Sequence, residues 1–171
     1  VAWRKQERVK SLRIAIQCAK LLNDTSVAAF YPTMFVLVTE ILDTFGQPVF
    51  ERITKRSQDL SKRPLHDDFT SEDVHPEARE TCRNWFFKVA SIRELVPRLY
   101  VEMSLVPCYR FLTQKDHMAI LARLGAMIRG VAGPLVGVYL RAYLGRVGAV
   151  ITATLQSNGG VAGVPVSQPE Y

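Results

Sequence analysis

The chain has 171 residues, a net charge of +6 at pH 7, and 48% hydrophobic against 22% charged residues. These proportions are typical of a folded globular protein and exclude a chain that is disordered throughout. The positive charge favours acidic partners or anionic lipid. The basic residues are spread along the chain rather than gathered with aromatic residues, so no nucleic-acid partner is expected. Because the sequence begins at Val1 without a methionine, we expect a piece of a longer protein.

The three cysteines, Cys18, Cys82 and Cys108, lie far apart among apolar residues. An odd number at wide spacing argues against a disulfide framework, and buried thiols are expected instead. No glycine-rich loop follows a strand pattern, so no phosphate-binding loop is predicted. We assign no catalytic residue, metal or cofactor, and we do not expect an enzyme.

Apolar residues recur at steps of three and four almost everywhere, which predicts helices. The first stripe ends near Asn23 and consists of Leu12, Ala15, Ile16, Ala19 and Leu22. The second consists of Phe35, Val38, Leu42 and Phe45. Gly46 is predicted to end this helix, and Pro48 to begin a short new one.

A polar segment at 57–74 is predicted to be a loop. The segment contains His66 among several carboxylates, and His75 follows it directly. The spacing of these residues matches no standard pattern of metal ligands. A solvated loop is the favoured interpretation. A metal-dependent enzyme that uses these histidines remains an alternative of a different class.

Helix is predicted to resume at Pro76, with Ala78, Cys82, Trp85, Phe86 and Val89 on its apolar side. Trp85, Phe86 and Phe87 are consecutive, so at most two of them can face the core. Ser91 with Glu94 matches a capping box for the next helix, whose stripe is Leu95, Leu99, Met103 and Val106.

Thr113 is predicted to cap a helix that carries Met118, Leu121, Leu124 and Ile128, with His117 on the surface. Gly130 and Gly133 then break the chain, and Pro134 begins the last helix. The apolar stretch 134–155 contains Arg141 and Arg146, so a buried helix is favoured over a bilayer span. Residues 156–171 are predicted to form a disordered tail after a helical domain at 1–155.

About seven helices with short connections indicate an all-α fold. Periodicity alone leaves two architectures open, an α-solenoid of HEAT-like helical hairpins and a closed bundle.

The cluster Pro97-Arg98-Leu99-Tyr100-Val101 is the most informative motif. Arg98 lies four residues from both Glu94 and Glu102, so local sequence favours an ion pair within the helix. The alternative is an arginine directed at acceptors of a partner protein. Leu99 shares a stripe with core residues and is itself a candidate for the core.

These residues resemble a motif of the large subunits of the retromer and retriever complexes. The resemblance extends to the blocks 127–131, 134–135 and 139–144, and to 10–20 and 41–46. The block 80–95, with the run Asn84-Trp85-Phe86-Phe87-Lys88, is similar to the retriever branch in particular. The similarity covers roughly residues 8–150, whereas the loop at 55–73 and the end of the chain depart from it.

The resemblance implies an α-solenoid that serves as the non-catalytic scaffold of a heterotrimer on the cytosolic face of endosomes and in the cytoplasm. It implies binding to an arrestin-like small subunit through Pro97, Arg98, Leu99, Tyr100 and Val101. A phosphoesterase-fold subunit would bind C-terminal repeats outside this chain. The complex would recycle membrane cargo to the plasma membrane with a sorting nexin adaptor and a COMMD and coiled-coil assembly.

Three alternatives remain open at this point. The chain could belong to a retromer large subunit acting in endosome-to-Golgi transport, to the metal-dependent enzyme above, or to a nucleic-acid-binding solenoid.

Overall fold

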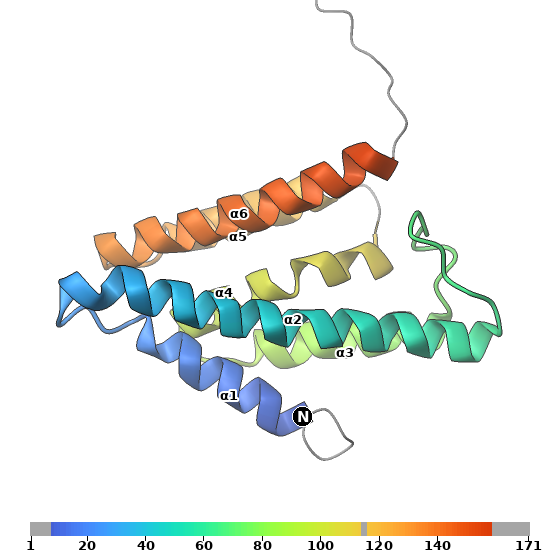
Figure 1. Ribbon diagram of the computed structural model, residues 1–171, viewed down its shortest axis with the longest axis horizontal. Helices are drawn as coiled ribbons and strands as arrows, with labels where there is room; N and C mark the ends of the chain where they lie inside the picture. Colours follow the sequence, from blue (N-terminus) through green and yellow to red (C-terminus); the bar gives the residue numbers. More distant parts are fainter. Residues whose placement is uncertain (1–7, 114–115, 159–171) are drawn as a thin grey trace, which may run out of the picture.

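The computed structural model describes residues 8–113 and 116–158, and these residues form helices without any strand. Figure 1 shows how the helices are arranged. In chain order they are α1 (Arg8–Leu21), η1 (Ala28–Phe30), α2 (Tyr31–Ser61), α3 (Pro76–Ala90), α4 (Leu95–Ser104), η2 (Val106–Phe111), α5 (His117–Ile128) and α6 (Pro134–Asn158). The predicted all-α fold is confirmed.

The prediction that the second helix ends at Gly46 is wrong. α2 continues through Gly46 and Pro48 to Ser61 as one helix. Its buried stripe, which keeps a single phase across the proline, consists of Val38, Leu42, Phe45, Val49 and Ile53. Packing along this whole stripe outweighs the backbone hydrogen bond that Pro48 cannot donate.

Gly46 is required where α2 crosses α4. A Cβ atom at this position would lie 2.3 Å from the backbone oxygen of Ser104. No side chain fits in this space, so only glycine lets the two helix backbones approach so closely. The residue that looked like a helix terminator is therefore a helix-packing residue.

α4 lies at the centre of the protein and packs against α1, α2, α3, α5 and α6. All but two of its ten residues are buried. Such a helix has no solvent-facing stripe, unlike the amphipathic surface helix of a typical globular protein. The other five α-helices of the described residues therefore pack around α4.

Two antiparallel hairpins flank α4 in a solenoid-like arrangement (Figure 1). One is α2 with α3 and the other is α5 with α6. α2 and α6 themselves run in the same direction and touch near their N-terminal halves. There the ring of Tyr139 lies 4.9 Å from that of Tyr31 and 4.8 Å from that of Phe35.

Two predicted helix caps are wrong. Ser91 ends α3 rather than opening α4, and its hydroxyl donates to the Phe87 carbonyl. Thr113 lies ahead of α5, whose N-cap is Asp116, and its hydroxyl donates to the Asp116 carboxylate. In both places the hydroxyl donates to an acceptor that lies close by in the sequence. Such local hydrogen bonds compete with the capping of a following helix.

The aromatic prediction is confirmed, and the prediction of buried thiols is confirmed for Cys82 and Cys108. Trp85 is buried, Phe86 is half-buried and Phe87 is 75% exposed. Cys82 and Cys108 are buried free thiols, and Cys18 is a partly buried one. Desolvation raises the pKa of the Cys82 thiol to about 12.

Two helices, at 28–61 and 134–154, have the length and apolar composition to cross a bilayer. Core helices pass the same criterion, so it is weak on its own. An ion pair between Asp43 of α2 and Arg146 of α6 joins these two helices, and both contribute buried residues to the common core. α6 buries only one face, so the expectation of a buried helix holds for that face alone.

α6 runs to Asn158, so it includes the first three residues of the predicted tail, 156–158. The remainder of the predicted tail, 159–171, lies outside the described residues.

We predict that Gly46→Ala destabilises the protein by about 1–3 kcal/mol, because the new methyl group forces α2 away from α4. Chemical denaturation followed by circular dichroism measures this change. Gly145→Ala in α6 is the matched control, since a Cβ atom there would have no neighbour within 4 Å among the described residues. That control gains up to about 1 kcal/mol from helix propensity. Equal effects of the two substitutions would contradict the packing role of Gly46.

Alkaline pH is predicted to unfold the protein. Burial raises the pKa of Tyr100 and Tyr143 above the ordinary value of 10.0. Above about pH 10 the unfolded chain ionises these phenols while the folded chain keeps them neutral, so stability is lost as pH rises through that range. Tyrosinate absorbance should therefore rise together with the loss of helical circular dichroism. Ionisation of all six tyrosines before any loss of helix would contradict this coupling.

Candidate functional site

The motif Pro97-Arg98-Leu99-Tyr100-Val101 lies in α4, and the structure buries most of it. Pro97 stands in the first turn, where its missing N–H is harmless. Leu99, Tyr100 and Val101 are 0% exposed. A partner cannot touch these side chains while α4 is packed, so any direct contact by the motif falls to Arg98, which is partly exposed.

Arg98 does not form the ion pair that its spacing suggests. Glu94 instead pairs with Lys20 of α1, with 2.5 Å between Oε1 and Nζ. Glu102 pairs with Arg123 of α5. The interpretation of an intrahelical ion pair is therefore wrong, because both carboxylates pair with basic residues of other helices. The Nε atom of Arg98 is buried and has no hydrogen-bond partner in the part of the chain that the structure describes.

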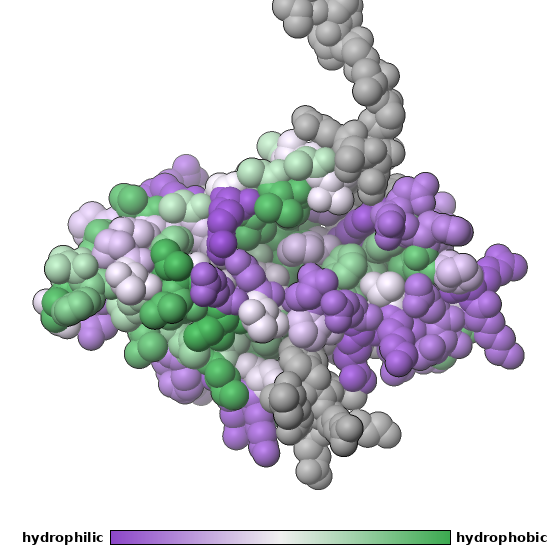
Figure 2. Space-filling model, viewed as in Figure 1, coloured by the Kyte–Doolittle hydropathy of each residue, from purple (hydrophilic) through white to green (hydrophobic). Residues whose placement is uncertain are grey.

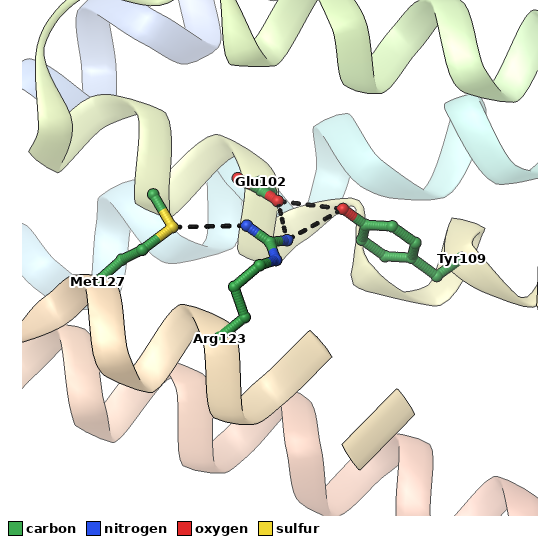
Figure 3. Close-up of polar contacts among 4 residues, drawn as sticks. All are labelled: Glu102, Tyr109, Arg123 and Met127. Carbon is green, nitrogen blue, oxygen red and sulfur yellow. Dashed lines mark hydrogen bonds and ion pairs between the residues drawn. The ribbon is translucent and has the colours of Figure 1, made fainter. Parts of the chain in front are cut away.

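A polar cluster beside Arg98 joins α4, η2 and α5 (Figure 3). Its centre is Glu102, whose side chain is only 7% exposed. Oε1 of Glu102 accepts from Nη2 of Arg123 and, at 3.1 Å, from the hydroxyl of Tyr109. Nη1 of the same arginine contacts the sulfur of Met127 at 3.4 Å. A buried carboxylate with both partners in place fixes α5 against α4.

A shallow groove of about 390 Å³ opens over this cluster, and we call it the Arg98 groove. Side chains of α3, α4, η2 and α5 line it: Arg83, Phe86, Phe87, Ala90, Arg98, Glu102, Tyr109, Leu112 and Arg123. Its floor is the stack of Phe86 on Tyr109, with 3.9 Å between the ring centroids. Burial of the Tyr109 phenol raises its pKa, so the hydroxyl stays protonated and can donate to Glu102.

The lining of the Arg98 groove carries three arginines and one carboxylate. Arg123 is neutralised by Glu102, and Arg83 pairs at 3.2 Å with the exposed Glu80. Arg98 makes no such pair within the described residues. With the exposed ring of Phe87 at its edge, the groove offers one unsatisfied guanidinium and apolar area. That combination suits a protein surface that carries acceptor groups beside an apolar side chain.

The polar loop shows no comparable arrangement. His75 caps α3, where its Nδ1 accepts from the Glu77 N–H at 3.2 Å. Among residues 8–113 and 116–158, no three histidine, cysteine or acidic side chains converge as metal ligands would.

Sequence reasoning missed Tyr109 and Arg123, which join Glu102 in the polar cluster, and it assigned Glu102 to the wrong arginine. The predicted surface position of His117 is wrong, since it is 5% exposed where α5 packs against the core. Glu102 carried a usable signal, because it stands alone in the apolar run from Leu99 to Val106. A charge in such a run needs a buried partner. Nothing near Arg123 in the sequence identifies it as that partner.

A family model described as VPS35L matches residues 1–159, nearly the whole chain. The chain belongs to the VPS35L family. Its sequence is 55% identical to VPS35 endosomal protein-sorting factor-like of Danio rerio over 157 residues. It is 54% identical to the Homo sapiens protein of that name over 155 residues and 52% identical to the Dictyostelium discoideum protein over 148.

These alignments cover 92%, 91% and 85% of this chain but only 16%, 16% and 15% of the relatives. The chain therefore corresponds to about one sixth of a VPS35L-family protein. The resemblance seen in the sequence is confirmed at the level of the family. The binding role of the Arg98 motif stays a prediction.

We predict that Arg123→Met destabilises the protein by about 2 kcal/mol, because it leaves the Glu102 carboxylate buried with only one hydrogen bond. This is less than the loss of roughly 3–5 kcal/mol typical of a fully enclosed pair, since Arg123 is 42% exposed. Urea denaturation at neutral pH measures it.

Arg83→Met is the matched control, because it breaks an exposed pair with Glu80 and should cost less than about 1 kcal/mol. Adding Glu102→Gln to Arg123→Met should restore part of the loss. If the two single variants were equally stable, the buried cluster would have no special role.

Proposed function

We propose that this chain is part of the scaffold of a retriever-type endosomal sorting complex, and that it binds the arrestin-like small subunit at the Arg98 groove. The chain acts by protein docking rather than by catalysis. The names of its relatives, VPS35 endosomal protein-sorting factor-like, support the sorting role. The motif shared with retriever and retromer large subunits supports the docking role.

One observation carries the proposal: Arg98 forms no ion pair with any described residue, although the carboxylates of Glu94 and Glu102 lie four positions away on either side. An exposed arginine normally finds such neighbours at four-residue spacing. Here Lys20 and Arg123 occupy those carboxylates, and the guanidinium faces an open groove. Its fixed fork of donors is suited to carboxylate or carbonyl groups of a partner.

The other four motif residues support Arg98 from beneath. Pro97, Leu99, Tyr100 and Val101 are buried in the packing of α4. The ring of Tyr100 lies 5.6 Å from that of Tyr143 on α6. These contacts set the rotation of α4 about its axis, and that rotation directs Arg98 outward. The motif thus combines one contact residue with a rigid base.

The remaining parts of the assembly follow the family resemblance. A phosphoesterase-fold subunit would bind repeats that this chain does not match, and a sorting nexin adaptor and a COMMD and coiled-coil complex would join the assembled trimer. The whole would associate peripherally with the cytosolic face of endosomes and return cargo to the plasma membrane. Docking in a retromer complex that serves endosome-to-Golgi transport is the second candidate, since the motif is shared by both large subunits.

The test is a binding assay of the 171-residue chain with the arrestin-like small subunits of retriever and of retromer. The chain should bind the retriever subunit more tightly, and Arg98→Ala should weaken that binding by at least about tenfold. Helicity should be unchanged, because the Arg98 guanidinium forms no ion pair with the described residues and so ties no other helix to α4.

Arg129→Ala is the control, since Arg129 is exposed at the end of α5 and lies outside the groove lining. Preference for the retromer subunit would favour the second candidate. Binding to neither subunit by the folded chain would refute the docking role.

A further inference from the structure

Phe87 of α3 is the most exposed large hydrophobic side chain among the described residues, at 75% exposure. Its ring has no aromatic or cation–π partner in that part of the chain. Exposure alone does not mark a binding site, because other apolar side chains also reach the surface of α1 and of the first half of α2 (Figure 2). Phe87 differs from them because it lines the Arg98 groove.

The two preceding aromatic residues hold Phe87 in its outward position. Trp85 is buried, and its ring lies 6.0 Å from that of Phe45 on α2. Phe86 stacks on Tyr109 of η2. Successive side chains of a helix point about 100° apart, so two inward neighbours direct the third ring outward. The backbone of Phe87 is therefore fixed before a partner binds, which lowers the entropy cost of burying its ring.

Phe87 and Arg98 come from different helices, α3 and α4, and line the same groove. Ala90 and Leu112 extend the apolar part of this lining. Arginine and large aromatic residues are among the kinds that contribute most to binding at protein interfaces. The groove thus offers a partner two different contacts, a directed polar contact at Arg98 and an apolar contact at Phe87.

The polar contact is open to many partners. The three arginines and one glutamate of the lining leave Arg98 as the group without an ion pair among the described residues. Lys88 lies outside the lining, with its ammonium group 5.6 Å from the centroid of the Trp85 ring. A guanidinium donates to any carbonyl or carboxylate oxygen within reach, and backbone carbonyls occur on every protein. Contact with Arg98 therefore strengthens binding without distinguishing between partners.

Burial of the Phe87 ring makes a stricter demand on a partner. The ring contributes favourable free energy only against an apolar surface that fits it. Opposite a polar or charged group, the ring would remove water from that group without replacing its hydrogen bonds, which opposes binding. Two partners that satisfy Arg98 equally well can therefore differ widely in the free energy of their contact with Phe87.

We propose that Phe87 is the specificity-determining residue of the Arg98 groove, so that its ring determines which arrestin-like subunit binds. The preferred subunit places an apolar side chain or pocket on the ring and an oxygen acceptor at Arg98. The inference rests on the proposed docking at this groove, but it does not depend on which of the two subunits is preferred. Because the Arg98 motif is common to both candidate functions, Arg98 cannot make that choice by itself.

The test measures the dissociation constants of the 171-residue chain for the arrestin-like subunits of retriever and of retromer. Phe87→Ser should weaken binding of the preferred subunit at least about tenfold and binding of the other subunit less than about threefold. Phe87→Leu keeps an apolar side chain and should retain most of the preference. Arg98→Ala should weaken both subunits by a similar factor, so the ratio of the two constants stays as in the parent chain.

Met118→Ser is the matched control, since Met118 is 71% exposed and lies outside the groove lining. It should leave both dissociation constants unchanged, and circular dichroism should show every variant folded. A loss of similar size in Met118→Ser and Phe87→Ser would overturn the proposal, because any exposed apolar side chain would then have the same effect.

Other outcomes overturn the proposal while the docking role of Arg98 stands. They are equal weakening of both subunits by Phe87→Ser, equal effects of leucine and serine at this position, a ratio changed by Arg98→Ala, and a parent chain without preference. Binding of only one subunit, with none of the other at about 1 mM, has the same meaning, because a contact open to any acceptor cannot exclude a partner. Binding of neither subunit by the folded chain refutes the docking role itself and this inference with it.

Discussion

The close contact between Gly46 and the backbone of Ser104 sets the geometry of the whole protein. It allows α2 to lie directly on α4, and α4 is the helix that every other long helix contacts. Interiors are packed so densely that a single methyl group at this crossing would be felt by all layers. Together with the buried motif residues, this contact determines how α4 packs against its neighbours.

The ion pairs around α4 form between different helices rather than within one helix. Lys20 reaches Glu94 from α1, and Arg123 reaches Glu102 from α5. Each of these contacts ties a flanking helix to α4, and together they leave Arg98 without an ion pair among the described residues. The same interactions that hold the helices in place therefore also free the side chain proposed to contact a partner. The packing of this helix and its proposed docking role therefore depend on the same contacts.

The sequence was sufficient for the fold class, for most helix positions and for the family, because helical periodicity and motif order are local properties. It misplaced the features that depend on distant residues. Gly46 and Pro48 resemble a helix end until α4 is placed against them. Glu94 and Glu102 resemble partners of Arg98 until α1 and α5 bring competing cations. The burial of His117 likewise depends on packing that no local pattern encodes.

The α5–α6 hairpin is joined to the first half of the chain by contacts between distant residues, as in the Tyr143–Asp43 hydrogen bond, which spans 100 positions. Closing so long a loop costs chain entropy, so the contacts between this hairpin and α2 are entropically more costly to form than the contacts within the hairpin. Because Arg123 of α5 both lines the Arg98 groove and pairs with Glu102 of α4, any opening of this hairpin would also dismantle that groove.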